Sequence, residues 1–289
     1  MTYKAHIVIG VGYVLASLVL FALNALLWLV CKRKEYRTRT YKIIRHLCFA
    51  CMMQLTIFMV SGAMTIAQNN FGYVNDKVCG ALIQSGWFLY IGLSLTLAVD
   101  RLFTFLGYTH SPIWNAISFA LLVASWLMWS VFLVFLLLPD FAMTYVGFYR
   151  WDYNDDRQIM IKVEKIVDFS AYIVVFTIYI IVFVFFLKMR CLSPSSNTQW
   201  IHMEFRLLTV AAISFSYEMI FDVFWFWGRD FIPNGILADC LANVLWILDC
   251  GLFAALTFVI SRSIRRKVFF MVCKRHIKIT VASTNLQQK

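Results

Sequence analysis

Residues 79–102 read CGALIQSGWFLYIGLSLTLAVDRL, and this stretch decides the fold. No charged residue occurs from Gly80 to Val99, and about 20 apolar residues are enough for a helix to cross the ~30 Å hydrocarbon core of a membrane. The run ends at Asp100 and Arg101, two adjacent charges that are costly to place in hydrocarbon. The stretch therefore predicts a membrane-spanning helix with its charges at one end.

The rest of the chain repeats this apolar pattern. Of the 289 residues, 62% are hydrophobic, which is well above the roughly 45–50% of a soluble domain. Backbone groups cannot face lipid unpaired, and a β-barrel would need alternating strands of about ten residues, so long apolar stretches must be helices. The sequence thus predicts an all-α membrane protein, a bundle of seven transmembrane helices. The stretches are 6–30, 47–67, 80–106, 113–138, 166–187, 207–228 and 238–261.

The basic residues predict the orientation of the bundle. Residues 31–46 hold seven Lys and Arg, residues 188–206 hold three and the segment from Arg262 holds eight, whereas the opposite side holds seven in all. Positively charged loops stay in the cytoplasm. We therefore expect the N-terminus outside and the C-terminus cytoplasmic, and the net charge of +11 does not indicate a nucleic-acid partner.

Two segments outside the predicted spans have a distinct composition. Residues 262–276, RSIRRKVFFMVCKRH, mix basic and apolar side chains, which predicts a short interfacial helix attracted to anionic membrane lipid. The chain then divides into a transmembrane bundle, 1–262, and a cytoplasmic tail, 263–289. On the outer side, FYRWDYNDDR at 148–157 is compatible with a lid over the bundle or with a solvated loop.

Three carboxylates are predicted to lie deep in the membrane. Glu218 and Asp222 are four residues apart, hence on one helix face, and Asp249 is near the middle of the seventh stretch. No Lys or Arg occurs at comparable depth, so these groups must be protonated, hydrogen-bonded to one another or to Tyr217 and Asn243, wetted, or matched by a cationic ligand. A structural network and a proton relay or cation pocket both remain open.

Aromatic residues gather in the outer halves of the third, fifth, sixth and seventh stretches. Rings with a few polar groups are the usual composition of a small-molecule site, although Trp and Tyr are also enriched at membrane interfaces. The candidate ligand-binding residues are Trp87, Tyr90, Tyr172, Glu218, Asp222, Trp225, Asp239, Asn243 and Trp246.

Several other functions lack the residues they need. There is no HExxH motif for a zinc protease, and Cys48 and Cys51 form a lone CxxC without a second ligand pair. The seventh stretch has no lysine for the imine of a retinal protein, and the chain has no glycine-rich filter or arginine-repeat helix. We expect no enzymatic activity, no cofactor and no bound metal.

The order and spacing of several motifs resemble a receptor family. Asp100-Arg101, at the cytoplasmic end of the third helix, looks like the Asp/Glu-Arg pair of rhodopsin-like G-protein-coupled receptors, and Asn24 matches that superfamily's polar position in the first helix. More narrowly, the chain resembles the nematode chemoreceptors of serpentine receptor class T. The matching residues are Tyr41, His46-Leu47, Gln54-Leu55, Ser85, Trp87, Leu97-Ala98, Arg101 and Ile264-Arg265.

This resemblance implies a multi-pass chemosensory receptor of the plasma membrane. It would bind a small environmental ligand in the outer half of the bundle and signal to a heterotrimeric G protein. In the superfamily the acid holds the arginine at rest, so Asp100 and Arg101 would be the coupling residues, while Asn24 and Asp249 would belong to a structural polar network. At this boundary the charge pair is expected to reach water or its own partner.

The sequence departs from the superfamily in ways that affect these expectations. Cys51 stands where many rhodopsin-like receptors have a sodium-binding aspartate, and the fifth and sixth helices contain no proline. Cys79 has no cysteine partner in residues 139–168, and Cys240 is the other outer thiol. The alternative is a proton- or cation-coupled transporter or channel that uses Glu218, Asp222 and Asp249.

Overall fold

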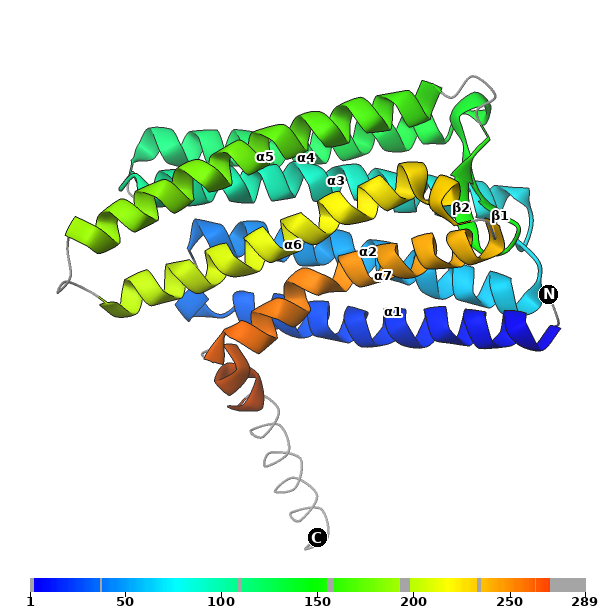
Figure 1. Ribbon diagram of the computed structural model, residues 1–289, viewed down its shortest axis with the longest axis horizontal. Coiled ribbons are helices and arrows are strands. Elements are labelled where there is room, and N and C mark those ends of the chain that lie inside the picture. The colour runs from blue at the N-terminus through cyan, green and yellow to red at the C-terminus, as the bar shows by residue number, and fades with distance from the viewer. Residues whose placement is uncertain are drawn as a thin grey trace, which may run out of the picture.

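The protein is an elongated bundle of seven helices (Figure 1). The computed structural model describes residues 3–36, 38–108, 111–154, 159–192, 198–232, 235–262 and 264–270. All seven helices are long and apolar enough to cross a membrane, which confirms the predicted fold class. They are α1 (Tyr3–Cys31), α2 (Arg39–Ala67), α3 (Tyr73–Phe105), α4 (Pro112–Leu136), α5 (Ile159–Leu192), α6 (Thr198–Phe231) and α7 (Gly235–Ile260).

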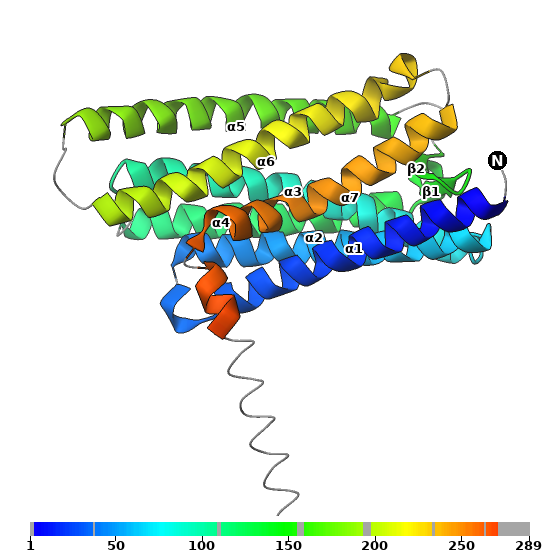
Figure 2. The ribbon, with the colours of Figure 1, turned by 60° about the horizontal axis from the view of Figure 1, so that its bottom comes forward.

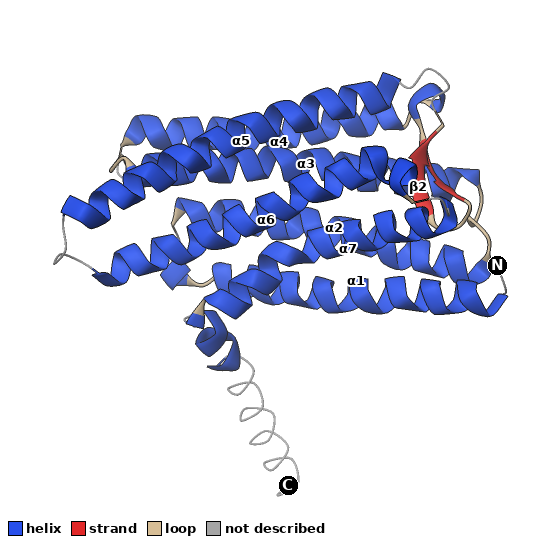
Figure 3. Cartoon of the chain, viewed as in Figure 1, coloured by secondary structure: helices blue, strands red, loops and turns tan. Residues whose placement is uncertain are grey.

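The helices alternate in direction, so their connections gather at two ends. One end, which we call the hairpin end, carries the N-terminal side of α1 and the strands β1 (Met143–Val146) and β2 (Arg150–Tyr153) (Figure 3). The other, which we call the basic end, carries the α1–α2 connection with the short helix η1 (Lys34–Tyr36), and it is the predicted cytoplasmic side. A second short helix, η2 (Pro139–Phe141), leads into β1.

The chain continues as a short helical segment after α7. Residues 264–270 are helical and turn away from the bundle, as Figure 2 shows. This agrees with the start of the interfacial helix predicted at 262–276, whereas positions 271–276 lie outside the described residues.

The helix boundaries differ most from the prediction at the start of α5. The sequence places 139–168 in a loop, yet α5 begins at Ile159. Its first turns carry Lys162, Glu164 and Lys165. These charges interrupt the apolar run, so hydropathy alone does not predict a helix here. Glu164 is buried while Lys162 is exposed, so the turn is amphipathic and belongs to the bundle.

Helix α3 is the central helix of the bundle. In an apolar 18-residue stretch of α3, 72% of the residues are buried, against 11% in the corresponding stretch of α4, and α3 packs on α2, α4, α5 and β1. Helices α1 and α2 approach closely at Gly10 and Gly62, where a Cβ on Gly10 would lie 2.6 Å from the Gly62 carbonyl oxygen. In lipid the hydrophobic effect does not drive helices together, so they associate through van der Waals packing. Small residues such as these glycines allow the two backbones to approach closely enough for it.

The β1–β2 hairpin is fastened to α3 without a disulfide. Cys79 and Cys240 are both free, and the Asp76 carboxylate instead accepts hydrogen bonds from the Tyr145 amide (2.9 Å) and the Asn70 side chain (2.7 Å). One turn along α3, a Cβ on Gly80 would lie only 1.9 Å from the Met143 carbonyl oxygen. Helix and strand can therefore touch here only because residue 80 has no side chain.

The hairpin closes the mouth of the bundle. Trp151 and Tyr145 are buried, with ring centroids 5.0 Å apart, and the Thr65 hydroxyl donates to the Phe148 carbonyl at 2.8 Å. Burial raises the pKa of the Tyr145 phenol above its usual range, which further favours the neutral ring. For residues 148–154 the structure supports the lid and not the solvated loop; residues 155–157 lie outside the described part of the chain.

We predict that Gly80→Ala destabilises the protein by about 1–3 kcal/mol, because the new methyl group overlaps the Met143 carbonyl and must displace the hairpin. Thermal unfolding of the purified protein, together with protease cleavage of the hairpin, measures this effect. Gly12→Ala is the matched control: no atom lies within 4 Å of its added Cβ, so it should be neutral or slightly stabilising. Equal effects of the two substitutions would contradict the close contact.

Candidate functional site

Five carboxyl side chains are buried between α3, α5, α6 and α7. Their exposed fractions lie between 0 and 3%, and they come from α5, α6 and α7. The sequence analysis found three of them and missed the two on α5. The five residues are Glu164, Asp168, Glu218, Asp222 and Asp249.

The missed pair had a recognisable spacing. Glu164 and Asp168 are four residues apart, as are Glu218 and Asp222, so each pair occupies one helix face. The neighbouring Lys165 turns to a different surface, where its ammonium lies 4.9 Å from the ring centroids of Phe226 and Trp227. Acid spacing of four residues, and not hydropathy, was the signal that could have placed α5 correctly.

Some of these carboxyl groups have a neutral donor as partner. The Tyr172 hydroxyl donates to Asp222 at 2.5 Å, and the indole of Trp87 donates to Asp168 at 3.2 Å. The amide of Gln84 donates to Glu164 at 2.9 Å. The carboxyl groups of Asp168 and Asp222 are also direct neighbours, so α5 and α6 are joined by an acid pair.

Other oxygen atoms of the cluster have no partner in the described part of the chain. These are both side-chain oxygens of Asp249, Oε2 of Glu164 and Oδ1 of Asp168. None of the five carboxyl groups forms an ion pair with a described Lys or Arg. In surroundings of low dielectric constant, adjacent carboxylates need a proton or an added cation to offset their charge.

A narrow aromatic crevice opens beside the acid pair. Its lining rings are in mutual contact, with Trp225 and Trp246 centroids 5.2 Å apart and those of Trp87 and Trp246 5.9 Å apart. The indole of Trp246 also donates to Gln54 on α2 at 2.9 Å. Without movement of these rings the crevice is too narrow for a water molecule. The residues that line it are Trp87, Glu164, Phe221, Asp222, Trp225 and Trp246.

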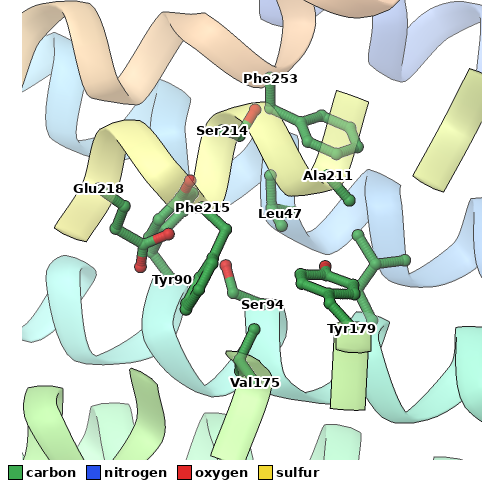
Figure 4. A pocket seen from close by; sticks show the side chains of 11 residues that line it. Leu47, Tyr90, Ser94, Val175, Tyr179, Ala211, Ser214, Phe215, Glu218 and Phe253 are labelled. Atoms are coloured by element: carbon green, nitrogen blue, oxygen red, sulfur yellow. The ribbon is translucent and has the colours of Figure 1, made fainter. Parts of the chain in front are cut away.

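A second void lies next to Glu218, nearer the basic end. Figure 4 shows Glu218 and Tyr90 at one side of this void and Tyr179 and Phe253 at the other. It has room for about one water molecule. Most of the residues that line this void are apolar. Glu218 is the one lining residue with a carboxyl group.

The structure therefore divides the predicted ligand-binding residues among several places. Trp87, Asp222, Trp225 and Trp246 meet at the aromatic crevice, while Tyr90 and Glu218 line the second void. Tyr172 reaches the crevice through its bond to Asp222. Asp239 lies at the hairpin end, 3.7 Å from Arg150, and Asn243 is fully buried on α7 near Tyr13.

Two other polar residues bind main chain and not the carboxylates. Tyr217 donates to the Leu245 carbonyl at 3.0 Å, so it is no partner of Glu218 or Asp222 as the sequence had suggested. Asn24 donates to the carbonyls of Leu20 and Cys250, both at 3.0 Å, and so ties α1 to α7 beside Asp249.

At the basic end Asp100 and Arg101 form a buried charge cluster. Asp100 is 0% and Arg101 1% exposed, so of the two expected partners, water or each other, the charges have each other. Their direct ion pair measures 2.7 Å, and Asp100 also accepts from Arg39 and Thr40, each at 2.6 Å. Burial is tolerated because the carboxylate has two cationic partners and a hydroxyl donor.

Arg39 extends this cluster to α4. Its guanidinium donates to the Asn115 side chain at 2.8 Å and lies 4.8 Å from the ring centroid of Trp114. Three helices, α2, α3 and α4, are thus joined through one carboxylate and its partners.

The described residues contain no group of three or more His, Cys, Asp or Glu side chains arranged to hold a metal ion.

Comparison with solved structures identifies the fold. The chain superposes on the crystal structure of squid rhodopsin with a TM-score of 0.75 at 13% identity, over 92% of this chain and 85% of that one. No protein-family model and no curated protein matches the sequence. The protein has the seven-helix fold of rhodopsin and is a multi-pass membrane protein.

We predict that Asp100→Asn lowers the free energy of unfolding by about 3–5 kcal/mol, because it leaves Arg101 buried without its counter-charge. Arg39→Gln should cost clearly less, since Arg39 is 17% exposed and Arg101 still neutralises Asp100. Thermal unfolding in lipid nanodiscs distinguishes the two. Asp152→Asn, at the partly exposed Arg150 ion pair of 3.7 Å, is the control and should change little.

Proposed function

We propose that this protein is a chemosensory receptor of the plasma membrane that couples to a heterotrimeric G protein. The observation that carries the proposal is the buried Asp100–Arg101 pair, which closes α3 at the basic end of a rhodopsin-like bundle. The narrower resemblance to serpentine receptor class T supports the chemosensory role. The protein would have no enzymatic turnover.

The charge cluster has the properties of a two-state switch. Asp100 binds Arg101 on its own helix and Arg39 on α2, so a shift of α3 relative to α2 changes the partners of both arginines. Packed polar clusters of this kind have discrete arrangements and not a continuum of them. One arrangement would present Arg101 to the G protein, together with basic residues of 188–206 and 262–276.

Ligand binding would act at the opposite half of the bundle. The residues that line the aromatic crevice come from α3, α5, α6 and α7, so a molecule placed there contacts four helices at once. It would favour the signalling arrangement only by its differential affinity for the two states.

A transporter or channel is the second candidate, and one observation favours it. Glu218 lines a void with room for about one water molecule, close to Asp222 and Asp249. Acidic groups with water between them are typical of proton pathways in membranes. This candidate requires flux across a membrane without any G protein.

We predict that Arg101→Ala abolishes G-protein activation while ligand affinity changes by less than about threefold, because Arg101 lies at the far end of α3 from the crevice. Nucleotide exchange on purified G protein and ligand binding are measured on the same nanodisc preparation, with insertion checked first. Lys42→Ala, which removes an exposed charge at the same end, should leave exchange largely intact.

The same preparation tests the transporter. In reconstituted vesicles the receptor gives no proton or cation flux, with or without ligand. If the vesicles show flux, and both Glu218→Gln and Asp249→Asn abolish it, the protein is a transporter or channel. That result would overturn the receptor proposal. A bundle with neither exchange activity nor flux would overturn both proposals.

A further inference from the structure

We propose that the aromatic crevice binds a small organic ammonium ion, a protonated primary or secondary amine with an apolar substituent. The inference rests on the proposed function, since it names the chemical class of the ligand for that receptor. Four independent features of the crevice point to a cation with N–H donors.

The first feature is the chemistry of the atoms without partners. Around the acid pair of α5 and α6, Oδ1 of Asp168 and Oε1 of Gln84 are buried acceptors without a partner in the described residues. Glu164 also has the Tyr153 hydroxyl of β2 as a neighbouring donor. Buried polar atoms are normally satisfied, so the two remaining acceptors require a donor. A primary ammonium supplies three N–H donors.

The second feature is charge. Asp168 and Asp222 are neighbours, and Glu164 lies close enough to both to act on them electrostatically. Three carboxyl groups inside a membrane-embedded bundle cannot all be ionised without positive charge nearby. A neutral ligand satisfies acceptors only through hydroxyl or amide groups, whereas an ammonium ion provides the donors and the charge together.

The third feature is the aromatic lining. Trp87, Trp225 and Trp246 surround the crevice with indole rings, and Trp is the ring whose face attracts a cation most strongly. Carboxylates combined with aromatic faces are the composition that recognises organic ammonium groups. A carboxylate ligand would be repelled by the acid pair, so acidic compounds are excluded.

The fourth feature is a cation already present at the edge of the crevice. The guanidinium of Arg150, on β2, lies 4.4 Å from the ring centroid of Trp225 and 3.7 Å from Asp239. It also exerts an attractive electrostatic effect on Glu164. One cation, tethered on β2, thus already lies beside the crevice.

Because the rings that close the crevice lie on different helices, a ligand can bind there only if those helices move. Phe221 and Trp225 are on α6, Trp246 is on α7 and Trp87 is on α3, and their mutual contacts leave no space for water. An ammonium headgroup enters only when these rings separate. Occupancy of the crevice therefore favours an arrangement in which α6 and α7 have moved relative to α3.

Binding to the full chain in nanodiscs tests the inference, with tryptophan fluorescence and thermal shift as readouts. The probes are 2-phenylethylamine, 2-phenylethanol and 3-phenylpropanoate, which present an ammonium, a hydroxyl and a carboxylate on one ring, together with a series of smaller and larger alkylamines. We expect the best amine to bind at least about tenfold more tightly than the alcohol, with no binding of the carboxylate.

Variants locate the site. Asp222→Asn and Glu164→Gln should each weaken amine binding by about tenfold and reduce the preference over the alcohol. Asp140→Asn is the control, because Asp140 is an exposed acid at the hairpin end that does not line the crevice, and it should change affinity by less than about threefold. Equal affinity for amine and alcohol, no binding of any amine, or equal losses in Asp140→Asn and Asp222→Asn would overturn the inference.

The same measurements separate this inference from the proposed function. Amine binding that needs Asp222 but never stimulates nucleotide exchange would leave the ammonium site intact and contradict the receptor. Exchange stimulated equally by neutral compounds, and unaffected by Asp222→Asn, would leave the receptor intact and remove the ammonium site.

Discussion

Every polar group in the spanning part of this bundle has to find its partner inside the protein, because hydrocarbon offers none. The buried charges show two solutions to this constraint. At the basic end, Asp100 is matched by two arginines and a threonine hydroxyl, so the cluster is complete. Between α5, α6 and α7 the carboxyl groups have only neutral donors, and several of their oxygens have no partner in the described residues.

Helix α3 joins these two regions. It carries Asp76 and Gly80, which fasten the hairpin, then Trp87 at the aromatic crevice and finally Asp100 and Arg101. Tyr179 of α5 lines the void beside Glu218 and lies near Arg101 as well, so packed side chains run from the carboxyl cluster to the basic end. The Asp100 cluster has all its charges paired, whereas the carboxyl cluster has oxygens without a partner. This difference suits a protein in which the two regions respond to different partners.

The hairpin shows how a different set of contacts does the work of a disulfide. Cys79 remains free, and an Asp76 carboxylate that accepts from the strand backbone, beside a glycine that allows contact at Met143, holds the loop on α3. Backbone hydrogen bonds to a buried carboxylate are strong because the acceptor is charged. The loop then brings Arg150 to Trp225, and so places a cation beside the crevice.

The sequence by itself determined the seven spans, the predicted orientation and the position of Asp100 and Arg101 at the end of the third span. Hydropathy and loop charge are local properties of the chain, and they decide directly which segments cross a bilayer and in which direction. Hydropathy did not place Glu164 and Asp168, because the neighbouring lysines make the start of α5 resemble a loop; only their four-residue spacing pointed to a helix. Only the tertiary structure decided which acids meet, that Arg39 completes the Asp100 cluster and that the Trp rings close on one another. These contacts depend on helix rotation and depth, which arise from packing between helices far apart in the chain and leave no local pattern.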